Sequence, residues 1–332
     1  MIREAIHTTE MVRLQLPARG SEQMMRASTL PPRRARRRAD SWHSPFILAL
    51  GIMLLSCGCF LLGGIWLSQS TGARTNVLIL GLDRRPEQGF IVRSDVVMLV
   101  TACPQTPRLG LLSIPRDLYV EVPRYGNNRI NTAHFWGERE AVGGGPDLAM
   151  ETVVHNFRVP VQHYVRVDFD GFRAVVDAVG GIDVVVEKPI VDNAYPTEDY
   201  GTMRIEIPAG PQRMDGERAL QYVRTRRGAS DFERAARQQQ VVMALLRRVV
   251  TPQNWPRLPA VVQTVAENVD MNLGPVEILR LSVTVLRVGV DNIEHHVIDR
   301  DMTRPWTTPT GGAVLLPRWE MIDPLVQALF EQ

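Results

Sequence analysis

An uncharged stretch of 33 residues, from Ser41 to Ala73, constrains the architecture of this chain more than any other feature. Within it, residues 46–67 form a run of 22 apolar or small side chains. As a helix this run is about 33 Å long, which is enough to cross a bilayer. Trp42 and Trp66 stand at its two ends, where membrane helices concentrate aromatic residues. The pattern predicts a single transmembrane helix over residues 46–67.

The charges around this span predict its orientation. Five arginines precede it closely: Arg33, Arg34, Arg36, Arg37 and Arg38. Because arginine and lysine are enriched on cytoplasmic flanks, we expect residues 1–45 to be a disordered basic tail in the cytoplasm and the chain beyond residue 70 to lie outside. Two rivals are a cleavable signal peptide, which the long apolar run disfavours, and a lipoprotein signal ending at Cys57, which the apolar residues 60–62 disfavour.

The composition of the 332 residues is that of an ordinary globular protein, with 45% hydrophobic and 22% charged residues. Three cysteines argue against a disulfide framework. A net charge of +2 creates no strong field toward nucleic acid, so we expect no nucleic-acid partner.

Short β-branched runs alternate with helical patterns after residue 75, which predicts an α/β fold: a mixed α/β/α sandwich around one central sheet. Strands are expected at 76–82, 96–101, 109–114, 161–167, 182–186 and 293–298. Helices are expected at 146–157, 169–179, 215–223, 231–250, 258–268, 276–288 and 319–330, with Asp215 and Asp231 capping two of them.

Glycine-rich segments and domain boundaries complete the outline. We expect turns at residues 126–131 and 143–145. No linker divides the chain after residue 75. We therefore expect a main domain over residues 75–252, with residues 253–332 packed on it as an extension or forming a small subdomain.

The segment from Tyr222 to Gln239 concentrates positive charge. It contains Arg224, Arg226, Arg227, Arg234 and Arg237. In a helix that begins near Asp231, this aspartate, Arg234 and Gln238 share one face, and Arg224 and Arg226 point to one side if their segment is extended. Converging guanidinium groups favour an anion, and phosphate suits their planar fork. The simpler alternative is a solvated basic helix face.

Three further motifs lie at the expected strand ends: Gly81-Leu82-Asp83-Arg84-Arg85, Arg93-Ser94-Asp95 and Ser113-Ile114-Pro115-Arg116-Asp117. Because ligands of open α/β sheets bind at the carboxyl ends of strands, Asp83 and Arg116 are expected to meet. Asp83 and Asp95 are candidate ligands of Mg²⁺, which favours one or two carboxylates together with substrate phosphates. Alternatively, Asp83 caps a turn and Asp95 pairs with Arg93.

These four motifs, in this order after one membrane span, resemble the LytR-CpsA-Psr family of bacterial cell-wall enzymes, most clearly over residues 75–250. The resemblance implies that Asp83 and Asp95 bind Mg²⁺, with Mn²⁺ as the alternative, and that these aspartates, Arg93 and Arg116 are catalytic. It implies a diphosphate site of Arg116, Arg224, Arg226, Arg234 and Gln238. Secondary candidates are Asp117, Arg129, Asn131, Asp231, Arg227 and Arg237. Arg129 stands where many relatives carry lysine, and Glu233 where many carry glycine.

The family resemblance also implies a function. The expected protein is a cell-membrane phosphotransferase with an extracytoplasmic catalytic domain, which moves a glycopolymer phosphate from a polyprenyl-diphosphate carrier to peptidoglycan. Two alternatives stay open: a polyprenyl-diphosphate pyrophosphatase without ligase activity, and a cell-envelope-related transcriptional attenuator. Apolar side chains are expected to line a trough for the lipid, with these candidates: Val153, Phe157, Val175, Val179 and Val241.

Overall fold

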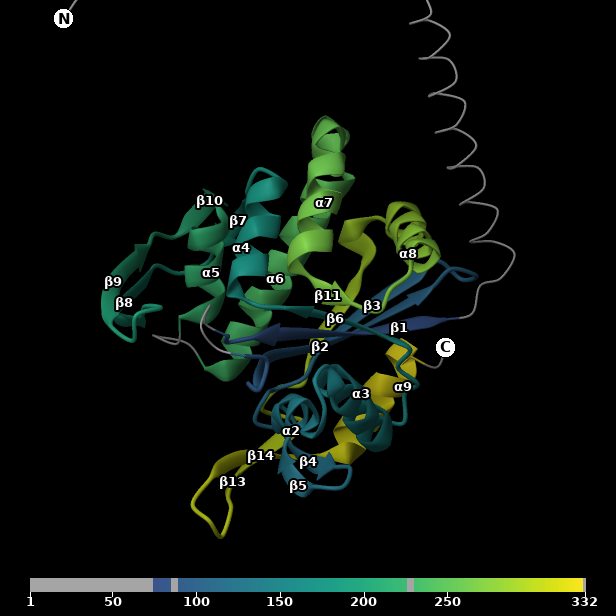
Figure 1. Ribbon diagram of the computed structural model, residues 1–332, viewed down its shortest axis with the longest axis vertical. Coiled ribbons are helices and arrows are strands. Elements are labelled where there is room, and N and C mark those ends of the chain that lie inside the picture. Colours follow the sequence, from purple (N-terminus) through teal and green to yellow (C-terminus); the bar gives the residue numbers. More distant parts are fainter. Residues whose placement is uncertain (1–73, 85–88, 226–229, 331–332) are drawn as a thin grey trace, which may run out of the picture. The chain divides into compact units, whose positions relative to one another are not determined.

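Six strands form one mixed sheet at the centre of the fold, in the order β11-β6-β1-β2-β3-β12 (Figure 1). Their bounds are β1 Thr75–Leu82, β2 Ser94–Cys103, β3 Arg108–Ser113, β6 His163–Val167, β11 Asp270–Met271 and β12 Glu294–Val297. β1 runs parallel to β6 and antiparallel to β2, and β3 runs antiparallel to β2 and parallel to β12. The predicted mixed α/β fold with one central sheet is confirmed.

The computed structural model describes residues 74–84, 89–225 and 230–330. The predicted tail and transmembrane helix, together with Arg226 and Arg227, lie outside these residues. Within the described ranges, no helix combines the length and the apolar character that a membrane crossing requires.

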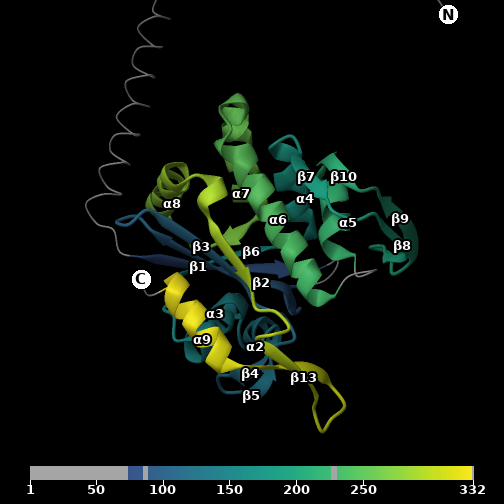
Figure 2. The ribbon, with the colours of Figure 1, turned by 180° about the vertical axis from the view of Figure 1, so that it is seen from behind.

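Helices cover both faces of the sheet (Figures 1 and 2). One face carries α4 Phe169–Ala178, α5 Gly216–Arg224, α6 Asp231–Val250, α7 Leu258–Asn268 and α8 Pro275–Val288. The other carries α2 Thr132–Glu140, α3 Gly144–Phe157 and α9 Trp319–Phe330. Two short 3₁₀ helices complete the set: η1 Pro252–Arg257 joins α6 to α7, and η2 Val290–Asn292 joins α8 to β12.

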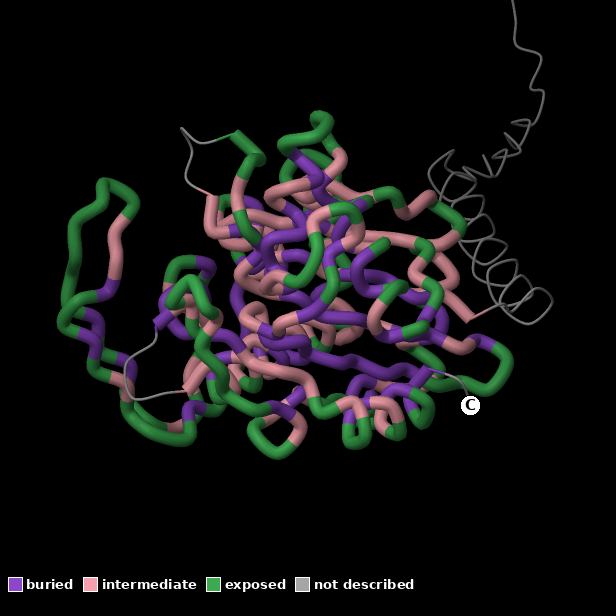
Figure 3. The backbone as a smooth tube through the Cα atoms, turned by 90° about the horizontal axis from the view of Figure 1, so that it is seen from below, coloured by how far each residue is buried: buried purple, intermediate pink, exposed green. Residues whose placement is uncertain are grey.

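The two faces of the sheet are filled differently. Leu78 and Leu80 on β1 and Leu99 on β2 are fully buried and belong to one core with α3 and α9. The alternate positions Ile79 and Val96 face the other way and are only partly buried. A second core, made by α4–α7 and the strands β7 Ile182–Val186 and β10 Gly210–Met214, contains none of these sheet residues. Buried segments run through the middle of the fold and exposed ones through its outer loops (Figure 3).

The last 80 residues contribute directly to the central architecture. They supply β11 and β12, the two edge strands of the sheet, and α9, whose Ile322, Val326 and Phe330 join the core beneath it.

Several local predictions need correction. The N-cap of α6 is Ser230, whose hydroxyl and Glu233 form a capping box, so Asp231 is the first helical residue instead of the cap. Gly144 and Gly145 begin α3 instead of forming a turn, because they pack against α2, where a Cβ on Gly137 would lie 2.2 Å from the Gly144 oxygen.

Small hairpins were missed by the sequence reasoning. The expected turn at residues 126–131 contains β5 Gly126–Arg129, which pairs with β4 Tyr119–Val122. The other two hairpins are β8 Ile190–Pro196 with β9 Thr202–Ile207, and β13 Thr303–Thr307 with β14 Ala313–Pro317. Their strands carry many exposed side chains, so a hydrophobic pattern marks them weakly.

Candidate functional site

The sheet brings the predicted carboxylates and Arg116 to one edge. β1, β3, β6 and β12 all end there, and β2 begins there, as their pairing directions require. Asp83 follows β1, Asp95 is the second residue of β2, and Arg116 follows β3 by three positions. The strand ends therefore bring these motifs close together, although the motifs are separated along the chain.

A cavity of about 700 Å³ opens at this edge, between the sheet and the helices α4, α5 and α6. Its floor is the sheet face left out of the two cores, formed by Ile79, Gly81, Val96 and Met98. Gly81 is directly opposite Val96, and a Cβ on this glycine would lie 2.8 Å from the Val96 Cβ. The glycine therefore lets the two strands present a smooth apolar floor.

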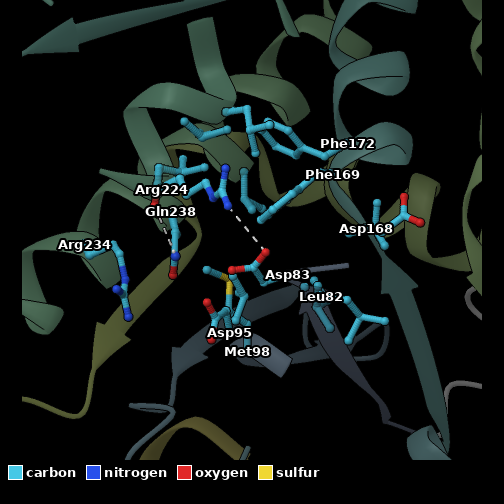
Figure 4. Close-up of a pocket in the computed structure, with 18 of the residues that line it drawn as sticks. Leu82, Asp83, Asp95, Met98, Asp168, Phe169, Phe172, Arg224, Arg234 and Gln238 are labelled. Carbon is cyan, nitrogen blue, oxygen red and sulfur yellow. Dashed lines mark hydrogen bonds and ion pairs between the residues drawn. The ribbon is translucent and has the colours of Figure 1, made fainter. Parts of the chain in front are cut away.

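The roof and walls of the cavity are also apolar. Phe169 and Phe172 extend from α4 over the floor (Figure 4), and α5 and α6 add four residues: Leu220, Val223, Val241 and Val242. Of the five predicted trough residues, only Val241 lines this cavity. Val153 and Phe157 lie in the core on the opposite side of the sheet. The prediction failed for them because helical spacing identifies an apolar face but not the neighbour that covers it.

Charged and polar side chains lie on the cavity wall near the sheet edge: Asp83, Asp95, Arg224, Arg234 and Gln238 (Figure 4). The structure therefore brings together five predicted residues from β1, β2, α5 and α6. Arg224 Nη2 lies 3.5 Å from Asp83 Oδ1, and Nη1 donates to the Pro196 carbonyl at 2.9 Å. Its guanidinium also lies 4.5 Å from the centre of the Phe169 ring, so it joins the charged mouth to the apolar wall.

Arg116 lies behind Asp95 and contacts three carboxylates. Its Nη1 is 2.8 Å from Asp95 Oδ1, Nε is 3.4 Å from Asp117 Oδ2, and Nη2 is 3.9 Å from Asp231 Oδ2. Burial alone would lower the pKa of Arg116, but these carboxylates outweigh it and the pKa is raised. Asp231 also lies 3.2 Å from Arg234, so a continuous row of ion pairs joins β2 to α6.

Two secondary candidates, Arg129 and Asn131, support this row instead of lining the cavity. Arg129 Nε lies 3.2 Å from Asp117 Oδ1, and Nη2 donates to the Ala313 carbonyl. The backbone of Asn131 joins the start of β2 to the Arg116 segment, because its carbonyl accepts from Ser94 and its amide donates to Arg116.

Arg237 and Arg93 also lie away from the cavity wall. Arg237 donates to the carbonyls of Tyr222 and Thr225 at 2.7 and 2.8 Å, and burial lowers its pKa. It therefore stabilises the end of α5. Arg93 is exposed and does not line the cavity.

Two cavity aspartates were not predicted. Asp168 follows β6, caps α4 by accepting from the Gly171 amide, and accepts from Arg84 Nε at 2.9 Å. Its place after a strand is the same signal that identified Asp83. Asp192 is buried and accepts from the Thr225 hydroxyl at 2.7 Å, a contact between distant segments that no local pattern reveals.

The donor set for a metal ion is limited to carboxylates. Among the residues that the structure describes, no three His, Cys, Asp or Glu side chains form a cluster suited to a metal. Asp83 and Asp95 nevertheless both line the cavity and offer hard oxygen donors (Figure 4). Two carboxylates fit Mg²⁺ when phosphates and water complete its coordination.

Comparisons with known proteins agree with the fold. The model of the LytR_cpsA_psr family matches residues 66–311. The polyisoprenyl-teichoic acid–peptidoglycan teichoic acid transferase TagU of Oceanobacillus iheyensis is 34% identical over 200 residues, which cover 60% of this chain and 58% of that relative. The chain thus aligns with less than two thirds of this relative's length.

Solved structures are similar over a larger share of the fold. The crystal structure of TagV from B. subtilis has a TM-score of 0.64 and 27% identity, covering 79% of this chain and 98% of that one. A structure of TagT bound to LIIa-WTA has a TM-score of 0.61 and 26% identity, covering 78% of this chain and 91% of the other.

Filling the cavity tests its role as a binding site for an apolar chain. Val242→Trp places a large ring among the cavity walls, and we expect it to raise the Kd for farnesyl phosphate at least about tenfold, which corresponds to about 1.4 kcal/mol. Isothermal titration calorimetry measures the change. Val154→Trp, at a position 39% exposed on α3, is the matched control and should leave the Kd unaltered. Equal Kd values for both variants would contradict the assignment.

Proposed function

The chain belongs to the LytR_cpsA_psr family, and we propose that it is a phosphotransferase that moves a glycopolymer phosphate from a polyprenyl-diphosphate carrier to peptidoglycan. One observation carries the proposal: an apolar cavity of about 700 Å³ has a polar wall that includes Arg224, Arg234, Asp83 and Asp95. A lipid-linked diphosphate has the same two parts, a long apolar chain and a compact anion. The similarity to TagU, a teichoic acid transferase, and to TagT bound to LIIa-WTA supports a teichoic acid as the glycopolymer.

The arginines at the mouth bind the diphosphate in this proposal. The acceptor hydroxyl oxygen forms a bond to the phosphorus of the glycopolymer phosphate. The bond from this phosphorus to the bridging oxygen of the diphosphate breaks, and polyprenyl phosphate leaves with that oxygen and its additional negative charge. Arg224 and Arg234 stabilise that charge from α5 and α6, as positioned cations do in phosphoryl transfer. Arg116 holds Asp95 in place through the 2.8 Å contact and adds positive charge from behind it. In this proposal Gln238, on the same wall, donates a neutral hydrogen bond to the diphosphate.

Asp83 and Asp95 would hold Mg²⁺, or alternatively Mn²⁺, together with the substrate phosphates. The bound ion would neutralise charge on the diphosphate oxygens. The hydroxyl of the acceptor must also lose a proton as the new bond forms. Asp83 and Asp95 face the cavity and are therefore better candidate bases than Asp117, whose carboxylate contacts Arg116 and Arg129 outside it.

The proposed location is the cell membrane. The uncharged run at residues 46–67 and the preceding arginines support a single span with a cytoplasmic N-terminus and an extracytoplasmic catalytic domain. This topology brings the cavity to the side of the membrane on which peptidoglycan lies.

Arg116→Ala tests the catalytic assignment. In an assay with a polyprenyl-diphosphate-linked glycopolymer, peptidoglycan and Mg²⁺, we expect kcat to fall about 10²–10³-fold, because positioned charge is lost near the reacting phosphates. Arg204→Ala, at an exposed position of β9, is the matched control and should keep full activity. A fully active Arg116→Ala protein would contradict the assignment of Arg116 as a catalytic residue.

The fate of the sugar phosphate in this assay separates transfer from hydrolysis. Transfer attaches it covalently to peptidoglycan, whereas a pyrophosphatase releases it into solution. Release of all the sugar phosphate in the presence of peptidoglycan would favour the pyrophosphatase.

Removal of divalent metal tests the proposed role of the two aspartates. Treatment with EDTA should abolish turnover, and addition of Mg²⁺ or Mn²⁺ in excess should restore it. Asp83→Asn and Asp95→Asn should each raise the metal concentration needed for half-maximal activity by at least about tenfold, since each removes a charged ligand. Undiminished turnover in EDTA would exclude the metal from the mechanism.

Single-cysteine labelling tests the topology. In a cysteine-free background, Tyr200→Cys, at a position 74% exposed, should react in intact cells with a membrane-impermeant maleimide. Ser28→Cys in the arginine-rich tail should react only after the membrane is permeabilised. The reverse labelling pattern would overturn the proposed orientation.

A further inference from the structure

Two hairpins beside the sheet edge have no role in the proposed chemistry. β4–β5 and β13–β14 lie together beneath the sheet, on the side of α2, α3 and α9 (Figures 1 and 2). Leu315 donates its amide hydrogen to the Asp117 carbonyl at 3.0 Å, and Leu118 and Leu315 form an isolated parallel bridge. The β13–β14 hairpin is therefore attached directly to the residue that follows Arg116.

This attachment is strengthened by a charged side chain. Arg129, at the end of β5, donates from Nη2 to the Ala313 carbonyl at 2.8 Å while its Nε contacts the Asp117 carboxylate at 3.2 Å. Because Asp117 also contacts Arg116, a continuous set of contacts runs from the mouth of the cavity to β14. The position of the hairpin is thus coupled to the proposed catalytic edge.

The hairpins present an aromatic pair at their surface. The rings of Tyr119 on β4 and Trp306 on β13 have centroids 5.5 Å apart and planes inclined by 59°. Trp306 is 38% exposed, and its neighbours Pro305 and Thr307 are exposed as well. Because Trp306 keeps part of its ring in water beside a second ring, the pair offers an aromatic face to a ligand.

The chemistry around this pair differs from that of the cavity mouth. Neutral hydrogen-bonding side chains occur in both hairpins: Asn127 is exposed on β5, Asn128 beside it is half-buried, and the hydroxyls of Thr308 and Thr310 lie 3.0 Å apart in the β13–β14 turn. The exposed apolar side chains of β13 are Pro305 and Trp306, which is a small area for a stable protein interface. Aromatic faces combined with neutral polar groups suit a sugar ring, which has apolar C–H faces and a rim of hydroxyl and amide groups.

The spacing also suits an extended saccharide that reaches the reaction site. Leu118 pairs with Leu315, and Leu315 pairs with Pro305, the neighbour of Trp306. Two strand spacings therefore separate the Arg116 segment from β13, roughly 10 Å.

We propose that Trp306 and Tyr119 form a subsite for the acceptor glycan, a β-linked chain of N-acetylated hexoses, and position its hydroxyl toward the Arg116–Asp95 edge. This inference rests on the proposed function, because it identifies where the acceptor of that reaction binds. Trp306 and Tyr119 are positioning residues, and the diphosphate is bound elsewhere, at Arg224 and Arg234.

Direct binding is the first test. The full-length protein in detergent is titrated with chitotetraose, a β-1,4-linked tetramer of N-acetylglucosamine, and binding is followed by calorimetry. Trp306→Ala should raise the Kd at least tenfold, whereas Trp306→Phe should recover part of the affinity. Trp255→Ala, at a position 51% exposed in η1 on the opposite side of the sheet, is the matched control and should bind as the wild type does. Failure of the wild type to bind, or equal Kd values for Trp306→Ala and wild type, would overturn the subsite.

Steady-state kinetics separate this subsite from the proposed function itself. With both substrates, Trp306→Ala should raise the KM for peptidoglycan at least about fivefold and leave the KM for the lipid-linked donor unchanged. An unchanged KM for peptidoglycan in an otherwise active enzyme would refute the subsite and leave the transferase proposal intact. If the wild type transfers nothing, the transferase proposal fails, and the chitotetraose titration still decides whether the hairpins bind glycan. An unchanged thermal midpoint of Trp306→Ala excludes misfolding as the cause of any loss.

Discussion

The contacts of Arg116 are the interaction on which the polar edge of this fold depends. One guanidinium joins Asp95 at the start of β2, Asp117 before β4 and Asp231 at the start of α6. Removing any of these carboxylates leaves the positive charge of Arg116 less well balanced, and its side chain is only 15% exposed. The same contacts keep Arg116 cationic and hold Asp95 and Arg234, through Asp231, on the wall of one cavity. The charge of the mouth and its geometry therefore have a common origin.

The cavity itself follows from an asymmetry in how the sheet is covered. Helices α3 and α9 pack tightly on one face and bury Leu78, Leu80 and Leu99. On the other face, α4–α7 make a core with β7 and β10, and this core contains none of the residues of β1 and β2. Ile79, Gly81, Val96 and Met98 on that sheet face line an opening of about 700 Å³, whereas Ala102 and Leu109 pack with Met243 in a third core. Leaving apolar surface uncovered is unfavourable in water, and a ligand with an apolar chain removes that penalty when it binds.

Sequence patterns predicted this site as far as local rules apply. Strand ends and their convergent direction identified Asp83, Asp95 and Arg116, and helical spacing identified Arg234 and Gln238 as one face. The same rules could not identify which side of the sheet Val153 or Phe157 would meet, because that choice depends on the path of the chain between elements. Asp192 could not be identified for a similar reason: its partner Thr225 is far along the chain, and Asp192 belongs to none of the four motifs. The prediction that Asp231 shares a helix face with Arg234 was right, whereas the prediction that it caps the helix was wrong, because Ser230 provides the cap.

The arginines of the original cluster differ in what their contacts allow them to do. Arg237 has its guanidinium engaged by two backbone carbonyls of α5 and its C-cap, so its charge is used to fix the end of that helix. Arg224, the last residue of the same helix, is thereby held over Phe169 and beside Asp83, at the boundary between the apolar cavity and its charged mouth. A side chain at this boundary can contact both parts of an amphipathic ligand, which a solvated basic helix face cannot. Arg237 thus supports the end of α5, whereas Arg224 and Arg234 line the cavity. This difference is the physical basis for proposing Arg224 and Arg234, ahead of Arg237, as ligands of the diphosphate.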